Sequence, residues 1–432
     1  MGVYLKDVLD ISPGARRFLL SEALYGIGIG LYTLVLNYHL LAMGIGEAKI
    51  GAIASTGILV LGALAIPLSM LANRIGRKPI LVSGVLLIGS GVYLFSAGDE
   101  LIHFYCAQIM VSIGFACIET TEVPLLFSYS RSRREETQVF SLMFAVFTMF
   151  VGGGTLLAGL IPEWISSGGE GSPYKPVLWC ASAVFIGLGL IRALWLPKET
   201  RGAARNGRNK LAPSEEGVQA AEAVASPHTG KPAKAVRGRP SKAVWTLAFY
   251  MLLSGISFAL IGGFNNVIAK QRLGWDDSSI SLLLTVNGLV LFFASLLTPW
   301  VLEKFGIAKP FKWMYFGGAL LAFILSLQLP VAAFAVLLLV RGGGFTMLSN
   351  MIDSQSMSAL PEKDRNLFAG MRSVFRSVGS AGATYTTGFL LAGGHAALPF
   401  ALTGVMLLIG YVYYYRFVRP LLQDKETGGH TT

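Results

Sequence analysis

Two acidic residues, Glu119 and Glu122, stand one helical turn apart inside the apolar run 101–128. Ionisable side chains within such a run are costly and by default indicate function. Two carboxylates at this spacing repel each other, so one of them is poised to take up a proton. The pair therefore predicts a site of proton uptake and release. The open alternative is a structural pair that an arginine or backbone groups of neighbouring helices satisfy.

Other polar residues extend along the same helix face. Gln108, Ser112, Glu119 and Glu122 recur at steps of four, seven and three, which places them on one side of a helix. Counting back from Arg131 at ~1.5 Å per residue puts Glu119 about 18 Å inside the membrane, near its midplane. A polar stripe in an apolar helix should face water and not lipid. Gln108 and Ser112 are therefore predicted to line a substrate cavity.

A third carboxylate begins a stripe in the first apolar run. This stripe consists of Glu22, Gly26, Gly30, Thr33 and Asn37. Because Glu22 follows Arg17 by only five residues, it lies close to the end of the apolar run and not in its middle. It is either a further proton-coupling acid or an ion-pair partner on the cytoplasmic side, and the sequence leaves both open. Thr33 and Asn37 are predicted to line the cavity, with Tyr25 as a stacking group.

In the second half of the chain, the charged residues within the apolar runs are mainly arginines. Arg372 and Arg376 lie one turn apart, and Arg341 lies in the preceding apolar run. They could bind an anionic part of a substrate, or pair with Glu119 or Glu122 in a charge switch. Arg372 is less than two turns from a loop, so we assign it to a cytoplasmic gate, and we assign Arg376 to the cavity. Three neutral residues complete the predicted cavity: Ser257, Asn265 and Asn350.

Composition shows which elements must hold these groups. Of the 432 residues, 53% are hydrophobic and only 14% are charged, against about 25% charged in an average soluble domain. Apolar runs of about 20 residues are long enough to cross a ~30 Å hydrocarbon core as helices. The sequence therefore predicts an all-α membrane protein. Twelve spans are expected, at 17–42, 48–72, 79–97, 101–128, 137–161, 176–196, 244–269, 278–302, 311–329, 331–355, 366–392 and 397–417.

The region 197–243 differs from the rest of the chain. It is rich in Ala, Gly, Pro, Ser and charge, so it cannot bury a core and is predicted to be a disordered basic linker. It separates an N-terminal half, residues 1–196, from a C-terminal half, residues 244–419, which a tail of residues 420–432 follows.

Lysine and arginine are concentrated in alternate loops, which predicts the orientation of the chain. The cations of the basic loops are Arg74, Arg77, Lys78, Arg131, Arg133, Arg134, Lys304, Lys309, Lys312, Lys363 and Arg365. The loops on the other side of the membrane hold few lysines and arginines. Both termini and the linker are therefore expected in the cytoplasm of a multi-pass protein in a plasma-type or inner membrane.

The two halves resemble each other at an offset of 230 residues. Arg74 and Gly76 then fall on Lys304 and Gly306, and Gly44 falls on Gly274. Agreements at one offset spread over five spans predict two parallel six-helix repeats. That architecture is typical of secondary transporters, with a binding site between the repeats near the midplane.

The segment from Ser69 to Lys78, SMLANRIGRK, resembles a signature of the major facilitator superfamily. The family pattern between its second and third helices is Gly-x-Leu-Ala-Asp-Arg-x-Gly-Arg-Lys. Six positions agree: Leu71, Ala72, Arg74, Gly76, Arg77 and Lys78. Two depart, with Ser69 for Gly and Asn73 for Asp. The resemblance covers the chain outside the linker and implies the twelve-helix fold of that family.

This loop implies a cytoplasmic gate as well as a topology signal. In the family, the Asp of the pattern helps to latch the cytoplasmic side in the outward-facing state. Asn73 has no charge to offer a helix N-terminus, so the latch is expected to be weaker. The alternative is that the cations only fix orientation. The predicted gate residues are Asn73, Arg74, Gly76, Arg77, Lys78, Lys304, Gly306 and Arg372.

Two signatures of the family's drug/proton antiporters are missing. The Arg of their fourth-helix motif is absent before Gly114, and the Gly-Pro step of their fifth helix is not reproduced around Gly152. The prediction is a secondary active transporter of a small organic solute working by alternating access. We expect proton-coupled efflux, that is antiport, of an amphipathic cationic or zwitterionic compound. The alternatives are proton-coupled uptake or uniport of a nutrient or organic anion, and a transport-inactive sensor or scaffold.

Other classes of function lack their motifs. The sequence has no Walker motif, no Ser/His/Asp constellation and no metal-ligand spacing, so neither an enzyme nor a cofactor or metal is predicted. The net charge of +11 comes largely from loops and linker, which predicts no nucleic-acid partner. The expected partners are a small-molecule substrate, protons and the lipid bilayer, with the protein as a monomer.

Overall fold

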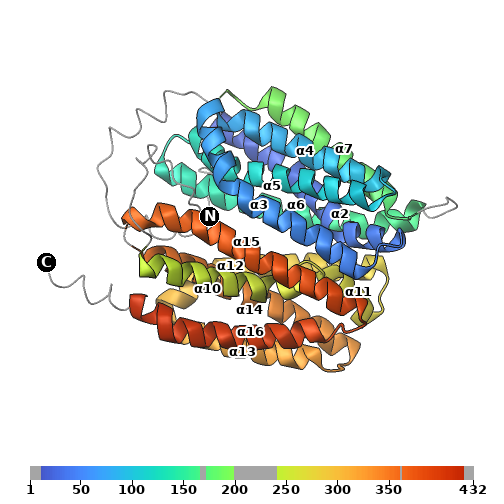
Figure 1. Ribbon diagram of the computed structural model, residues 1–432. Helices are drawn as coiled ribbons and strands as arrows, with labels where there is room; N and C mark the ends of the chain where they lie inside the picture. The colour runs from blue at the N-terminus through green and yellow to red at the C-terminus, as the bar shows by residue number, and fades with distance from the viewer. Residues whose placement is uncertain (1–10, 166–171, 199–240, 361, 423–432) are drawn as a thin grey trace, which may run out of the picture. The chain divides into compact units, whose positions relative to one another are not determined.

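The computed structural model describes residues 11–165, 172–198, 241–360 and 362–422 (Figure 1). Within these ranges the chain forms helices and no strand. The first half contributes α2(Pro13–Ala42), α3(Glu47–Ile75), α4(Arg77–Ala97), α5(Leu101–Tyr129), α6(Arg133–Ile165) and α7(Lys175–Trp195). The second half contributes α10(Lys242–Gly262), α11(Asn265–Leu273), α12(Asp277–Phe305), α13(Ala308–Ser326), α14(Val331–Ser358), α15(Glu362–Ala392), α16(Leu398–Tyr413) and η2(Tyr414–Val418). Apart from the short α11 and η2, each half supplies six helices, which confirms the all-α prediction.

Ten helices in the described residues are long and apolar enough to cross a membrane. The other two long helices are α13, with Lys309 and Lys312 near its start, and α15, which carries Arg372 and Arg376. Most of the predicted linker, residues 199–240, and the tail from residue 423 lie outside the described residues.

The helix bounds reproduce the offset of 230 residues. Helix α3 begins at Glu47 and α12 at Asp277, while α5 begins at Leu101 and α14 at Val331. The backbone at two pairs of glycines agrees as well: φ is +78° at Gly44 and +64° at Gly274, and +103° at Gly76 and +70° at Gly306. Positive φ favours glycine because it has no Cβ. The repeat predicted from the sequence thus appears in the turns as well as in the helices.

One predicted span is corrected. The seventh span was expected to run unbroken over 244–269, but α10 ends at Gly262 and α11 begins at Asn265. Two successive glycines, Gly262 and Gly263, precede the break, and glycine is unfavourable in a helix interior. Asn265 therefore begins a new helix instead of continuing the wall on which Ser257 lies.

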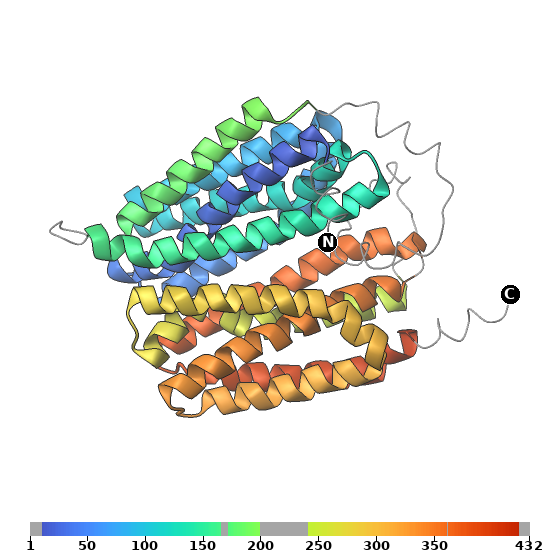
Figure 2. The same ribbon diagram turned by 180° about the vertical axis from the view of Figure 1, so that it is seen from behind.

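The chain divides into two compact units. Unit 1 contains α2, α3 from Ala63 onward, α4 to α7, and α12 from Asp277 to Leu289. Unit 2 contains the first part of α3, from Glu47 to Gly62, then α10, α11, α12 from Val290 onward, and α13 to η2. In unit 1, α2 packs along α6 and α7, and α4 packs along α5 and α7 (Figure 2). In unit 2, the closest helix pairs are α10 with α15 and α13 with α16.

Glycines permit the close contact between α2 and α6. A Cβ added at Gly30 would lie 2.5 Å from the Thr155 nitrogen and would also overlap the Val151 oxygen. From the other side, a Cβ at Gly154 would lie 2.9 Å from Ile27 Cα. Small residues allow two membrane helices to bring their backbones together. This contact fixes α2, the helix that carries Glu22.

The start of α2 is tied to the loop between α5 and α6 by one carboxylate. Glu135 accepts hydrogen bonds from the backbone N–H groups of Ser12 at 2.7 Å and Arg131 at 2.6 Å. The hydroxyl of Ser12 donates to the Tyr129 carbonyl at 2.7 Å. Burial raises the pKa of Glu135, but the hydrogen bonds from Ser12 and Arg131 outweigh it, so the pKa lies below its ordinary value of 4.5.

This carboxylate predicts a pH dependence of stability. A carboxyl whose pKa is lower in the folded state stabilises the fold above its unfolded pKa, and that contribution is lost as pH falls through the folded value. We expect Glu135→Gln to cost about 1–3 kcal/mol at pH 7. The difference from wild type should shrink as pH falls below 4.5. Thermal unfolding in detergent from pH 7 to 3 measures it, with the exposed Glu303→Gln as control. A pH-independent difference would contradict the prediction.

Candidate functional site

A buried ion cluster joins three helices of unit 1. Arg192 Nη2 lies 2.6 Å from Glu22 Oε2 and 3.9 Å from Glu122 Oε1. The Nε of Arg192 donates to Ser21 Oγ at 3.1 Å. The Arg192 side chain is 0% exposed and that of Glu22 is 1% exposed. An arginine and a carboxylate are thus fully enclosed within a helix bundle.

The positions of the three helices bring these residues together. Glu22 lies in the third turn of α2, Glu122 in the second half of α5, and Arg192 in the last turn of α7. Aromatic rings flank the guanidinium: the Arg192 Cζ is 5.1 Å from the centre of the Phe18 ring and 5.5 Å from that of Tyr25. Cation–π contacts of this kind are strongest when desolvated.

The charge balance of the cluster is uneven. Two carboxyls, Glu22 and Glu122, face the one guanidinium of Arg192. With one proton the cluster is neutral, and without it the cluster carries a net negative charge in a buried site, which is costly. The arrangement can therefore bind and release a proton.

Two atoms of the cluster are buried with no hydrogen-bond partner among the described residues. They are Glu122 Oε1 and Arg192 Nη1. The third carboxyl of the sequence prediction, Glu119, is exposed on α5 one turn before Glu122. Glu119 is thus the member of this acidic group that is open to solvent or solute.

The other predicted residues of this half differ in exposure and in hydrogen-bond partners. Gln108 Nε2 donates to Ser112 Oγ at 3.3 Å, which supports their common face. Thr33 is exposed, with its hydroxyl donating to the Ile29 carbonyl at 2.8 Å, and Asn37 is partly buried. Tyr25, predicted to be a stacking group for substrate, is 6% exposed and packs against Phe147, Phe185 and Arg192.

In unit 2 two arginines share one carboxylate. Arg376 Nη1 donates to Asp353 Oδ2 at 3.1 Å, and its Nη2 contacts Asp353 Oδ1. Arg372 Nη2 lies 3.4 Å from Asp353 Oδ2. Arg376, predicted to line the cavity, and Arg372, predicted to belong to the gate, are thus brought together. Asp353 on α14 is the partner of both.

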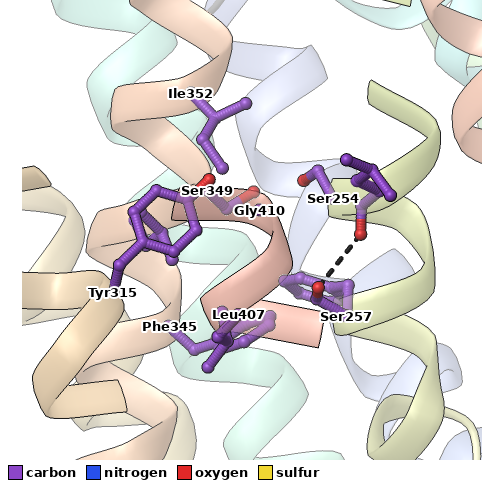
Figure 3. Close-up of a pocket in the computed structure, with 11 residues that line it drawn as sticks. Ser254, Ser257, Tyr315, Phe345, Ser349, Ile352, Leu407 and Gly410 are labelled. Atoms are coloured by element: carbon purple, nitrogen blue, oxygen red, sulfur yellow. Dashed lines mark hydrogen bonds between the residues drawn. The ribbon is translucent and has the colours of Figure 1, made fainter. Parts of the chain in front are cut away.

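A small pocket in unit 2 lies between α10, α13, α14 and α16 (Figure 3). Its volume is about 10 Å³, which is room for roughly one water molecule. The polar residues of its wall are Ser254, Ser257, Ser349 and Tyr315. The hydroxyl of Ser257 donates to the Leu253 carbonyl at 3.0 Å, the dashed line in Figure 3. Ser257 therefore lies in the wall of this small pocket, and its predicted place in a substrate cavity stays a prediction.

The remaining cavity candidates lie in the same unit. Asn350 Nδ2 donates to Ser295 Oγ at 3.2 Å. Asn265 has a buried Oδ1 without a hydrogen-bond partner among the described residues. The structure does not bring Asn265 or Asn350 to the small pocket.

The loop signature makes structural contacts within unit 1. Arg77 Nη1 donates to the Pro124 carbonyl at 3.1 Å, and Lys78 Nζ donates to the Leu196 carbonyl at 2.6 Å. These bonds hold α4 against α5 and against the end of α7, so Arg77 and Lys78 have a structural role whatever their part in gating. Asn73 and Arg74 are exposed. They are the members of the signature that remain open to a gate partner.

In the corresponding turn of unit 2, between α12 and α13, the lysine contacts aromatic rings. Lys304 is exposed, and its Nζ lies 4.8 Å from the centre of the Trp300 ring and 5.6 Å from that of Phe305. Gly306 follows with positive φ. Lys304 thus occupies the place of Arg74 in the repeat with a different environment.

Sequence reasoning missed Arg192. It is a charged residue four positions before the end of the predicted span 176–196, and it was not singled out as a candidate. Its charge inside an apolar run was the available signal. Asp353 gave the same kind of signal in the tenth span, and its two arginine partners were not deduced.

The described residues form only helices, arranged as two six-helix repeats with buried charges within them. This is the architecture of a secondary membrane transporter. The model of the Major Facilitator Superfamily matches residues 18–384 and 247–431. The chain belongs to this superfamily, as the loop signature indicated, and it is a multi-pass membrane transporter and not an enzyme.

Two curated relatives are similar over part of their length. A "Chloramphenicol resistance protein" of Pseudomonas aeruginosa is 26% identical over 188 residues, covering 42% of this chain and 41% of that protein. The "4-hydroxybenzoate transporter PcaK" of Pseudomonas putida is 25% identical over 159 residues, covering 37% of this chain and 34% of that protein. The matched region thus spans less than half of either relative.

Solved structures share the fold over nearly the whole chain. A bacterial homologue of the human lysosomal transporter Spinster, in an inward-facing and unoccupied conformation, has a TM-score of 0.71 at 15% identity, covering 95% of this chain and 97% of that one. The nucleoside transporter NupG has a TM-score of 0.68 at 13% identity, covering 93% and 98%. At these identities the likeness establishes the fold alone.

Proposed function

We propose that this transporter couples solute movement to protons through the cluster of Glu22, Glu122 and Arg192. The observation that carries the proposal is the placement of two carboxyls, one fully buried and one 16% exposed, around one buried guanidinium. This group of three is neutral only with one bound proton. Gain or loss of that proton changes the buried charge by one unit. Buried charge is costly, so protonation favours one conformation over another and drives alternating access.

Glu119 serves as the proton entry residue in this proposal. It is exposed and lies one turn from Glu122 on the same helix face. A proton taken up at Glu119 passes to Glu122, and Glu22 keeps Arg192 paired while Glu122 changes its charge. The three acids named from the sequence thus receive different parts in one reaction.

For the direction of transport we propose efflux by antiport. The chloramphenicol resistance relative has a name that supports it. The exposed carboxylate of Glu119 supports an amphipathic cationic or zwitterionic solute. We place the protein as a monomer in a plasma-type or inner membrane, with both termini and the linker cytoplasmic, and with Asn73, Arg74, Lys304 and Arg372 in the cytoplasmic gate.

A second candidate is coupled uptake of an organic anion. The 4-hydroxybenzoate transporter among the relatives supports it. So does Arg341, a partly exposed cation in α14 for which the described residues provide no ion-pair partner. The direction of proton movement relative to the solute separates the two candidates. When the solute enters a vesicle, antiport moves protons out and symport moves protons in.

Proteoliposomes with an internal pH dye test the coupling. An inside-acid gradient is imposed, and cationic, zwitterionic, anionic and sugar-like solutes are added in turn. We expect at least one solute to collapse the gradient with wild type and with Glu303→Gln, an exposed control. Glu122→Gln should reduce the proton flux at least about tenfold, because its neutral amide cannot carry the proton.

The choice of Glu122→Gln keeps the Glu22–Arg192 pair intact, so the protein should fold. Counterflow of the same solute without a pH gradient should persist in this variant. The double variant Glu119→Gln/Glu122→Gln should behave likewise. Normal coupled flux in Glu122→Gln would exclude the cluster as the proton site.

A further inference from the structure

The arginines of unit 2 differ in how their charges are satisfied. Arg372 and Arg376 share Asp353. Arg341 has no ion pair with any carboxylate of the described residues, and its Nε is buried without a hydrogen-bond partner among them. Its guanidinium instead lies against an aromatic ring, with Cζ 5.1 Å from the centre of Phe345.

The depth of Arg341 makes this charge costly. It is the eleventh residue of α14, which begins at Val331, so it lies about 15 Å along the helix axis at ~1.5 Å per residue. Phospholipid headgroups are at the ends of such a helix, not at this depth. A cation here should face water or a bound partner and not hydrocarbon.

The surroundings of Arg341 have the composition of a subsite for an aromatic solute. Phe345 is partly exposed, and its ring centre is 5.1 Å from that of Phe258, which is 45% exposed. Arg341 is itself partly exposed. Arg341, Phe345 and Ser349 recur every four residues, so they share one face of α14. Ser349 and Phe345 also line the small pocket between α10, α13, α14 and α16.

We propose that Arg341 binds the anionic group of the transported solute, while the rings of Phe345 and Phe258 contact its apolar body. The solute is then an organic acid or a zwitterion with an aromatic or similarly flat apolar part. A guanidinium presents paired donors that match a carboxylate. Arg341 is partly exposed and has no carboxylate partner among the described residues, so its guanidinium is available for this contact. This inference rests on the proposed transport function and restricts its substrate to solutes with an anionic group, which excludes a purely cationic solute.

The test uses full-length protein in a lipid-free maltoside detergent, which removes anionic headgroups as a source of ligand. The probes are benzoate and 2-naphthoate with their neutral amides, at constant ionic strength. Thermal unfolding is followed by tryptophan fluorescence. At least one acid should raise the unfolding temperature saturably, and its amide should not. Equal effects of acid and amide, or no effect of either acid, would overturn the proposal.

Substitutions then assign the effect to Arg341. Arg341→Gln should raise the half-saturating acid concentration about tenfold or more, as expected for loss of a charge-assisted hydrogen bond. Arg341→Lys keeps the charge without the paired donors and should bind several-fold more weakly than wild type, which keeps the test open if the Gln variant does not fold. A wild-type response in either variant would refute the proposal.

Arg419 provides a matched control. Its Nε is also buried without a described partner, and its Cζ lies 5.1 Å from the Tyr415 ring centre. It lies near the end of the helical part of the chain and away from the pocket. Arg419→Gln should respond to acid as wild type does.

The binding assay has no pH gradient, so its result is independent of proton coupling. Acid binding without coupled flux would overturn only the proposed proton coupling. Coupled flux without acid binding would overturn only this substrate class.

Discussion

Replacing Arg192 with methionine is expected to lower the free energy of unfolding by about 3–5 kcal/mol. Methionine fills a similar volume, but it leaves Glu22 and Glu122 enclosed without a cation. The remaining carboxyls must both become neutral or recruit water into a packed bundle. Phe18 and Tyr25 also lose the guanidinium that lies between their rings.

Thermal unfolding in detergent and the yield of monodisperse protein measure this effect. Arg16→Met, at an exposed position of α2, is the matched control and should unfold as wild type does. The triple variant Glu22→Gln/Glu122→Gln/Arg192→Met removes every charge of the cluster. It should recover most of the lost stability without recovering proton coupling. An Arg192→Met protein as stable as Arg16→Met would show that the cluster does not hold the helices together.

Two adjacent glycines of α6 should respond in opposite ways to alanine. At Gly154 a Cβ would lie 2.9 Å from Ile27 Cα and 3.0 Å from the Ile27 carbonyl carbon. These are backbone atoms, so α2 and α6 must move apart, and we expect a loss of about 1–3 kcal/mol. At Gly153 a Cβ would meet nothing within 4 Å. There alanine should be neutral or gain up to about 1 kcal/mol from its higher helix propensity.

The comparison of Gly153→Ala with Gly154→Ala controls for helix propensity, membrane depth and neighbouring sequence. Unfolding temperatures in one detergent give the result directly. If the two variants unfold at the same temperature, the contact between α2 and α6 is not as close as the structure has it. Coupled flux should fall with stability in Gly154→Ala, because this contact positions Glu22.

The ion cluster could be predicted from the sequence only in part. The type and spacing of Glu119 and Glu122 indicated a proton-binding site, and the apolar surroundings of Glu22 marked it as unusual. What decided between a cavity acid and an ion-pair partner for Glu22 was Arg192, 170 residues further on. Contact between helices so distant in the chain depends on packing, which a single sequence does not display.

Helix existence and repeat were easier to predict than helix continuity. Apolar runs of membrane length need no partner to be recognised, and the offset of 230 residues needed only matching glycines. The interruption at Gly262 and Gly263 was missed because the seventh run is apolar on both sides of it. Its counterpart α2 runs unbroken from Pro13 to Ala42, so the repeat itself argued for a continuous helix.

The pairing of Glu22 with Arg192 also constrains the order in which the helices can insert and pack during synthesis. During synthesis, Glu22 emerges 170 residues before its partner. At about 5–20 residues per second, that interval is roughly 10–35 s. For that time α2 must either remain at the insertion machinery or enter the bilayer with Glu22 as a neutral acid, since an unpaired charge there is costly. The helices of the first half can therefore complete their packing only after α7 has been synthesised. A chain truncated before Arg192 should remain incompletely folded.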